Sequence, residues 1–165
     1  MNKVFANTGE IPLPSWSTRM CRFAKKVLAE LNRNNWELSI LLCNDKFIAD
    51  LNARYRNKPE PTDILTFSLN TTIEKEGKTR LQTVFLPGDI VISLETLREN
   101  AKYFQTTEDE ELRRLIIHGI LHLDNMNHET NDKTEPMLEL QERILTRLGT
   151  EHIITAETQK RRLKK

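Results

Sequence analysis

The sequence has few of the features that identify secreted or membrane proteins. It has 165 residues but only two cysteines, Cys21 and Cys43, which excludes a disulfide-rich fold. Uninterrupted apolar stretches are only a few residues long, so the chain has no candidate transmembrane segment. Residues 1–14 contain one lysine and no apolar core, and they do not resemble a secretory signal. We therefore expect free thiols and a cytoplasmic location.

An excess of charge of either sign is also missing. The chain has 25 basic and 24 acidic side chains and a formal net charge of +1, so its overall field does not attract nucleic acids strongly. If the protein binds RNA or DNA, it must then do so through local basic patches. The length fits one domain, which we place at residues 1–150, followed by a basic tail, 151–165, that we expect to be disordered.

Hydrophobic periodicity divides this domain into alternating strands and helices. Strands are predicted over residues 1–6, 36–43, 62–69 and 89–93, and helices over residues 15–31, 44–56, 93–104, 107–123 and 134–149. Residues 70–81 are polar and are predicted to form a loop or the end of a hairpin. The last helix has a buried stripe that includes one glutamine, Gln141. The predicted fold class is α+β, a single domain with a mixed sheet of about four strands and about five helices.

The helix predicted over residues 107–123 contains the feature that points to chemistry. Its apolar residues cover most of its sides, which indicates a buried helix, and Thr107 is a suitable N-cap. Yet His118 and His122 lie four residues apart on one face. A third histidine, His128, follows a polar segment that can turn the chain back. A buried imidazole needs a hydrogen-bond partner or a metal ion.

These histidines have the spacing H-x3-H-x5-H. Three imidazoles can bind one ion and leave a fourth tetrahedral position open, an arrangement typical of catalytic rather than structural zinc. We therefore predict one Zn²⁺ bound by His118, His122 and His128. Another divalent ion such as nickel also suits three nitrogen ligands. The simpler alternative is a set of structural histidines that hold no metal.

The same spacing occurs in the metzincin protease signature H-E-x-x-H-x-x-G-x-x-H. Gly119 occupies the position of the glutamate that acts as general base, which argues against peptide hydrolysis. Asn125 occupies the position of the turn glycine. Because asparagine tolerates a positive φ better than most residues, the turn remains possible.

Four segments together resemble the YbeY family of bacterial rRNA maturation factors and metal-dependent endoribonucleases. Residues 118–128 resemble its HGxLHLxGYDH motif, and the other matches are LNARYR at 51–56, PTDILTF at 61–67 and GDIVI at 88–92. The resemblance extends over roughly residues 36–149. It implies an α+β fold, and a zinc ion on the three histidines. It also implies cleavage of single-stranded RNA, 3′-end processing of small-subunit (16S) rRNA, ribosome quality control and a partnership with the small ribosomal subunit and its proteins.

The resemblance also suggests roles for individual residues. The functionally sensitive arginine of the family falls on Arg56, so Arg56 and His118 are the candidate catalytic residues. Arg56 would bind a non-bridging phosphate oxygen, and Arg54, Arg56 and Lys58 would contact the RNA backbone. We expect Tyr55, at the spacing of an apolar helical stripe, in the core rather than stacked on a nucleobase.

This sequence departs from the family at GYD, which is Asn125-Met126-Asn127 here. The acid next to the third histidine is missing, and Asp124 is its candidate substitute. Asp63, before an apolar strand, is expected to be structural.

Three functions compete at this point. The first is a zinc-dependent endoribonuclease, in which either water or a 2′-OH attacks the phosphodiester. The second is a zinc hydrolase of another class, such as a peptidase. The third is a ribosome-assembly factor with a mainly structural zinc. Neither a membrane nor DNA is an expected partner.

Overall fold

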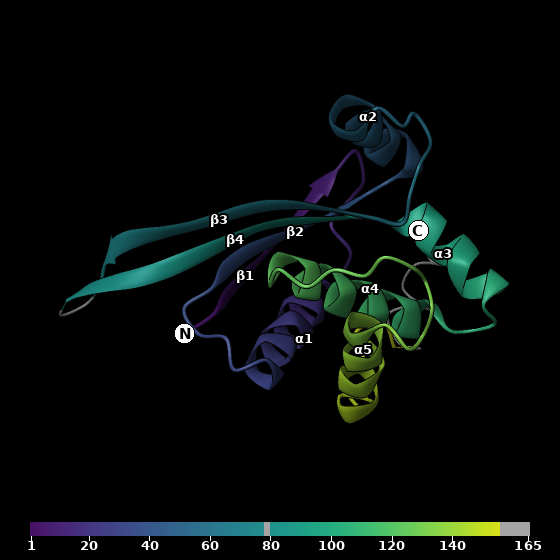
Figure 1. Ribbon diagram of the computed structural model, residues 1–165. Helices are drawn as coiled ribbons and strands as arrows, with labels where there is room; N and C mark the ends of the chain where they lie inside the picture. The colour runs from purple at the N-terminus through teal and green to yellow at the C-terminus, as the bar shows by residue number, and fades with distance from the viewer. Residues whose placement is uncertain (78–79, 156–165) are drawn as a thin grey trace.

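The structure is a computed structural model that describes residues 1–77 and 80–155. Its elements, in chain order, are β1 (Lys3–Gly9), α1 (Ser17–Glu30), β2 (Glu37–Cys43), α2 (Asp45–Arg56), β3 (Ile64–Glu76), β4 (Leu81–Ser93), α3 (Leu94–Tyr103), α4 (Glu108–Leu123) and α5 (Pro136–Arg147) (Figure 1). The strands form one sheet in the order β1-β2-β4-β3, in which only β3 is antiparallel to its neighbour. The described residues thus confirm the predicted α+β fold with a mixed four-stranded sheet. None of their helices is long and apolar enough to span a membrane.

The alternation of side chains along the strands gives the sheet two apolar faces. On one face, Leu38, Ile40 and Leu42 of β2 join the main core beneath α1 and α4. On the other face, Cys43 and its neighbours form a smaller cluster beneath α2. Figure 1 shows α2 alone above the sheet, with α1, α4 and α5 on the opposite side. A site formed by α2 and α4 together must therefore lie at an edge of the sheet.

Strands β3 and β4 are longer than predicted. Residues 70–81 were predicted as a loop or the end of a hairpin; residues 70–76 continue β3, and residues 81–88 begin β4 ahead of the predicted start at residue 89. Together they form a hairpin that projects beyond the rest of the sheet (Figure 1). The hairpin is present, but the predicted strand bounds were too short, because most of these residues are exposed and no buried face imposes an alternating pattern on the sequence.

A β-bulge marks the point where this hairpin leaves the sheet. The register places Ser68 opposite Gly88 and Thr71 opposite Leu86, so two residues of β3 face only Pro87. Pro87 has no N–H to donate to the ladder, which explains the irregularity. Asn70, one of these two residues of β3, has a φ of 49°.

Helix α4 lies close against the sheet at Gly119. An ideal Cβ built on this glycine would lie 2.9 Å from Cδ1 of Ile90 and 3.1 Å from Cδ1 of Ile64. Gly119 therefore faces the sheet and allows the helix to approach it. A side chain at this position would point into the core, not toward an open site.

The folded part of the chain extends past the boundary predicted at residue 150. Ile153 is completely buried. The backbone N–H groups of Ile153 and Ile154 both donate to Oδ1 of Asp109 at 2.7 Å. Residues 156–165 of the predicted tail lie outside the described residues. Both cysteines are free, as expected, with Cys43 buried and Cys21 partly exposed.

Candidate metal centre

The three histidines predicted as ligands lie together at the C-terminal end of α4. The Nε2 atoms of His118 and His122 are 3.0 Å apart, and one ring nitrogen from each of the three histidines lies within 4.8 Å of the other two. Zinc–nitrogen bonds of about 2.0–2.1 Å in a tetrahedron place ligand nitrogens about 3.3 Å apart. Small side-chain movements would bring the three nitrogens to that spacing.

A Schellman motif after α4 turns the chain back and delivers His128. The N–H of Asn125 donates to the carbonyl of His122, and the N–H of Met126 donates to the carbonyl of Leu121, both at 3.0 Å. Asn125 has a φ of 63°, which confirms that it can replace the turn glycine. The turn thus depends on the left-handed conformation of one asparagine.

Two further contacts fix the same loop. Arg33 donates to both carboxylate oxygens of Asp124, at 2.7 and 3.0 Å, and Asn70 of β3 donates to Oδ1 of Asn125 at 3.2 Å. Asp124 is therefore held by Arg33, and its substitution for the missing acid beside His128 stays a prediction.

Each histidine holds its ring in place through Nδ1. The partner is a carbonyl oxygen in all three cases: Gln141 Oε1 at 2.8 Å from His118, Met126 O at 3.1 Å from His122, and Thr130 O at 2.8 Å from His128. A carbonyl oxygen only accepts, so each Nδ1 carries the proton and each Nε2 keeps a free lone pair. A divalent transition metal binds to ring nitrogens with such a free lone pair.

Burial also favours the neutral form of two of these rings. Burial lowers the pKa of His118 and of His122. The positive charge of Arg56 contributes to the lowering of the pKa of His122. A neutral imidazole is the form that binds metal, so protons compete weakly with an ion at neutral pH.

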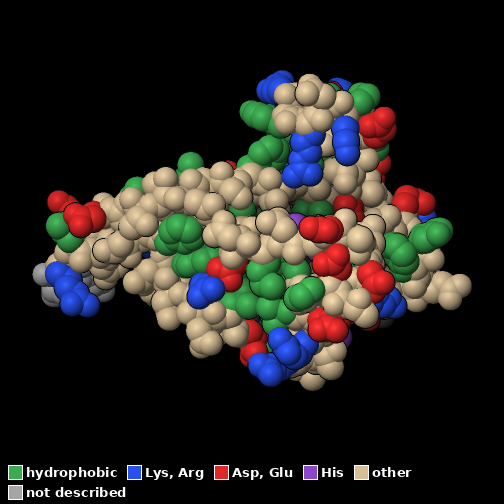
Figure 2. Space-filling view, in the orientation of Figure 1, with side chains coloured by type: hydrophobic (Ala, Val, Ile, Leu, Met, Phe, Trp, Pro, Cys, Tyr) green, Lys and Arg blue, Asp and Glu red, His purple; other side chains and the backbone are tan. Residues whose placement is uncertain are grey.

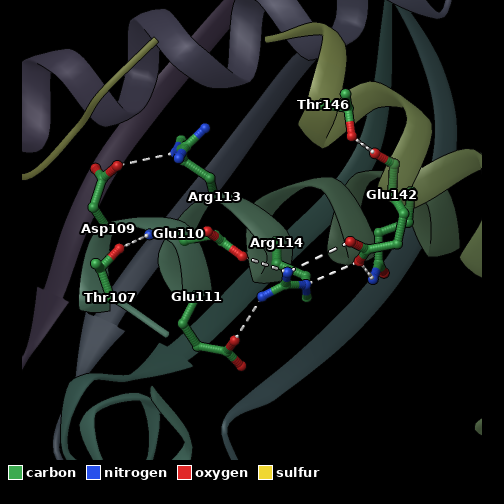
Figure 3. A network of polar contacts seen from close by, with 9 residues as sticks. Thr107, Asp109, Glu110, Glu111, Arg113, Arg114, Glu142 and Thr146 are labelled. Carbon is green, nitrogen blue, oxygen red and sulfur yellow. Dashed lines mark hydrogen bonds and ion pairs between the residues drawn. The ribbon is translucent and has the colours of Figure 1, made fainter. Parts of the chain in front are cut away.

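Gln141 of α5 determines the orientation of His118. Its side chain is buried, and its Nε2 donates to Oε1 of Glu142 at 3.0 Å, which leaves Oε1 to accept from His118. Glu142 in turn pairs with Arg114 of α4 at 2.9 Å. Figure 3 shows this arginine between Glu142 and two acids of the first turn of α4, Glu110 and Glu111. In the sequence, Gln141 was visible as a single amide in an otherwise apolar stripe. The sequence pattern did not indicate that its partner is His118.

Replacement of Gln141 by leucine tests this assignment. We expect Zn²⁺ affinity to fall about 10- to 100-fold, because Nδ1 of His118 loses the acceptor that holds the ring. Competition with a chromophoric chelator measures the affinity. Gln141→Glu loses the hydrogen bond to Glu142 but keeps an oxygen acceptor for Nδ1 of His118, so it should retain more affinity than the leucine variant. Wild-type affinity in the leucine variant would contradict a positioning role.

The predicted RNA-contacting residues lie at the C-terminal end of α2. Arg54 and Arg56 are in its last turn, Lys58 follows it, and all three are exposed. Figure 2 shows Lys and Arg side chains on the underside of α2 above a recess, with histidine at its base. The structure therefore places positive charge of α2 above the histidines.

Tyr55 is not in the core, contrary to the prediction. It is 62% exposed, and its ring forms a T-shaped pair with that of Phe67 at a centroid distance of 5.2 Å. The apolar stripe of α2 reaches the edge of the sheet at this point, because Phe67 belongs to the edge strand β3. Among the described residues, no further strand lies beyond β3 to cover Tyr55. Asp63, as expected, has structural contacts: it accepts from the N–H of Ile64 and from Asn100.

Comparisons with known proteins agree with this geometry. The family model described as Endoribonuclease YbeY matches residues 5–149. Endoribonuclease YbeY of Treponema denticola is 45% identical over 128 residues, covering 77% of this chain and 80% of that protein, and the Treponema pallidum protein is 42% identical over 145 residues, covering 88% and 89%. The solution structure of TM1509 from Thermotoga maritima matches with a TM-score of 0.59 and 26% identity over 91% of both chains. The chain belongs to the YbeY family of endoribonucleases.

Proposed function

We propose that this protein is a zinc-dependent, single-strand-specific endoribonuclease. In this proposal it acts in the cytoplasm with the small ribosomal subunit, matures the 3′ end of 16S rRNA and contributes to ribosome quality control. The observation that carries the metal and the reaction is the convergence of ring nitrogens from three histidines beneath Lys and Arg side chains of α2. Membership in the family supports the choice of RNA as the substrate.

In this proposal the histidines bind the metal ion and the basic residues at the end of α2 bind the RNA. His118, His122 and His128 would hold the ion, and a bound zinc ion supplies Lewis-acid chemistry toward water and phosphoryl oxygens. Arg56 binds a non-bridging oxygen of the scissile phosphate and offsets the charge that develops there. Arg54 and Lys58 contact neighbouring phosphates. Because the net charge of the chain is only +1, these local contacts rather than the overall field hold the RNA.

The position of Gly119 disfavours a peptidase. A metzincin has its general-base glutamate at this position, but Gly119 faces Ile90 and Ile64 in the core. Among the described residues, the three histidines form the one cluster of potential metal ligands, and it includes no carboxylate. Water activation by a carboxylate next to His118 in the sequence therefore has no structural basis here.

One preparation tests the proposal in three assays: bound metal, cleavage of single-stranded RNA, and cleavage of casein. Wild type should bind about one zinc ion and cleave RNA but not casein. His118→Ala should lose both metal and cleavage. Arg56→Ala should keep the metal but lose about 10²- to 10³-fold in kcat, the usual effect of removing one group that stabilises the transition state.

Three results would contradict the proposal. Equal RNA cleavage in all variants would indicate a contaminating nuclease. Casein cleavage that depends on His118 would establish a peptidase. Stoichiometric zinc without RNA cleavage would indicate an assembly factor with a structural metal.

A further inference from the structure

An aromatic pair, Tyr55 and Phe67, lies at the protein surface beside the proposed RNA-binding arginines. The two rings meet edge to face, at an interplanar angle of 70°. Phe67 is partly buried and packs against the small core under α2, so it gives the tyrosine ring a fixed neighbour. Tyr55 itself remains 62% exposed. The ring therefore has a fixed support and a large accessible surface.

The surroundings of this pair carry positive charge. Arg54 and Arg56 flank Tyr55 in the sequence, and both are exposed. Figure 2 shows Lys and Arg side chains of α2 above the recess that has histidine at its base. An aromatic ring next to arginines suits a ligand that is both flat and anionic.

Strand β3 connects the aromatic pair to the metal centre. Phe67 contacts Tyr55, and Asn70, three residues farther along β3, donates to Asn125 in the loop between His122 and His128. Three residues of a regular strand extend over about 10 Å, and the β-bulge in this stretch shortens that span. A short stretch of an extended chain can therefore contact the aromatic pair and the histidines at the same time.

We propose that Tyr55, supported by Phe67, stacks on an unpaired nucleobase of the RNA whose phosphate Arg56 binds. This inference rests on the proposed function, and it adds the contact that would favour single strands. Stacking on aromatic side chains requires bases that are free of a duplex, and it accepts any base because each has a π-face. Tyr55 acts as a binding residue that fixes one nucleotide relative to the scissile bond.

Binding of single-stranded 2′-O-methyl oligonucleotides to the zinc-loaded protein tests the proposal, with gels to show that the oligonucleotides stay intact. Tyr55→Ala should bind about 5- to 150-fold more weakly, the range for one stacked base, whereas Tyr55→Phe should bind like wild type. Tyr103→Ala is the matched control, because Tyr103 is an 81% exposed tyrosine at the end of α3. Thermal melting should show that all variants are folded.

An abasic scan locates the contact. In wild type, removing the base at one particular position should weaken binding by a similar factor, and Tyr55→Ala should be insensitive to the same change. With cleavable RNA, Tyr55→Ala should raise KM more than it lowers kcat. Unchanged affinity in Tyr55→Ala would overturn the stacking proposal, and so would an equal loss of affinity for the abasic oligonucleotide in both proteins. In either case the proposed function would stand as long as RNA cleavage depends on His118. Loss of the proposed function has a different signature, namely no cleavage that depends on His118.

Discussion

Asp109→Ala is expected to destabilise the protein by about 3–5 kcal/mol, the usual result of removing one partner of a buried ion pair. The side chain of Asp109 is 9% exposed and that of its partner Arg113 is 6% exposed, with 3.0 Å between Nε and Oδ2. The alanine variant leaves this guanidinium charge without its carboxylate. It also removes the acceptor of the N–H groups of Ile153 and Ile154, which fix the end of the folded chain.

Thermal and urea unfolding measure this effect, and the melting temperature should fall by roughly 6–20 °C for a domain of this size. Glu99→Ala is the matched control, because that carboxylate is 72% exposed and pairs with Lys102 at the surface. Its free energy of unfolding should change by no more than about 0.5 kcal/mol. Equal losses of stability in both variants would mean that the buried contacts of Asp109 stabilise the fold no more than an exposed ion pair does.

Asp109 should also contribute to the pH dependence of the free energy of unfolding. Burial opposes the ionisation of Asp109, but hydrogen bonds from His152 and from two backbone N–H groups hold its pKa below the usual value. A lowered folded-state pKa gives stability that is complete above the unfolded value of about 3.9 and is lost as the pH falls through the folded one. Asp109→Ala should therefore lose less stability on acidification than wild type does.

Zinc should stabilise the folded protein by about 4 kcal/mol at a free concentration one thousand times its Kd. The reason is that an ion that binds only the folded chain adds its binding free energy to folding. His122 and His128 belong to different segments joined by the loop after α4, so the ion would also tie that loop to the helix. Differential scanning calorimetry with and without a chelator measures the gain.

His122→Ala should abolish this gain, because only two of the three nitrogens remain. His152→Ala is the matched control, since His152 lies outside the cluster and contacts Asp109 instead. The control should keep the zinc-dependent shift even if its own baseline stability changes. A shift of equal size in His122→Ala would show that zinc binds elsewhere.

The sequence was most informative where the determinants are local. The three histidines fall within eleven residues, and the helix that carries two of them is apolar on most sides, so the cluster was predictable. The left-handed turn at Asn125 was also predictable, because few residues tolerate that conformation. Each of these features depends on neighbours in the sequence.

Other parts of the site depend on partners that no pattern names. Gln141 meets His118 only because α5 packs against α4, and Asp124 is engaged by Arg33 from the segment that follows α1. Tyr55 continues an apolar stripe, but the sheet ends beneath it. In each case the side chain was visible in the sequence, and its surroundings were decided by the tertiary structure.

The projecting hairpin has a consequence for association with other chains. Where β3 and β4 leave the sheet, both have backbone edges that can pair with a strand of another molecule, the usual route to edge-to-edge aggregation. Residues Glu74, Lys75 and Glu76 place charges of alternating sign along β3, and an added strand would have to desolvate them. The polarity that made this segment resemble a loop in the sequence is therefore also its protection against unwanted strand pairing.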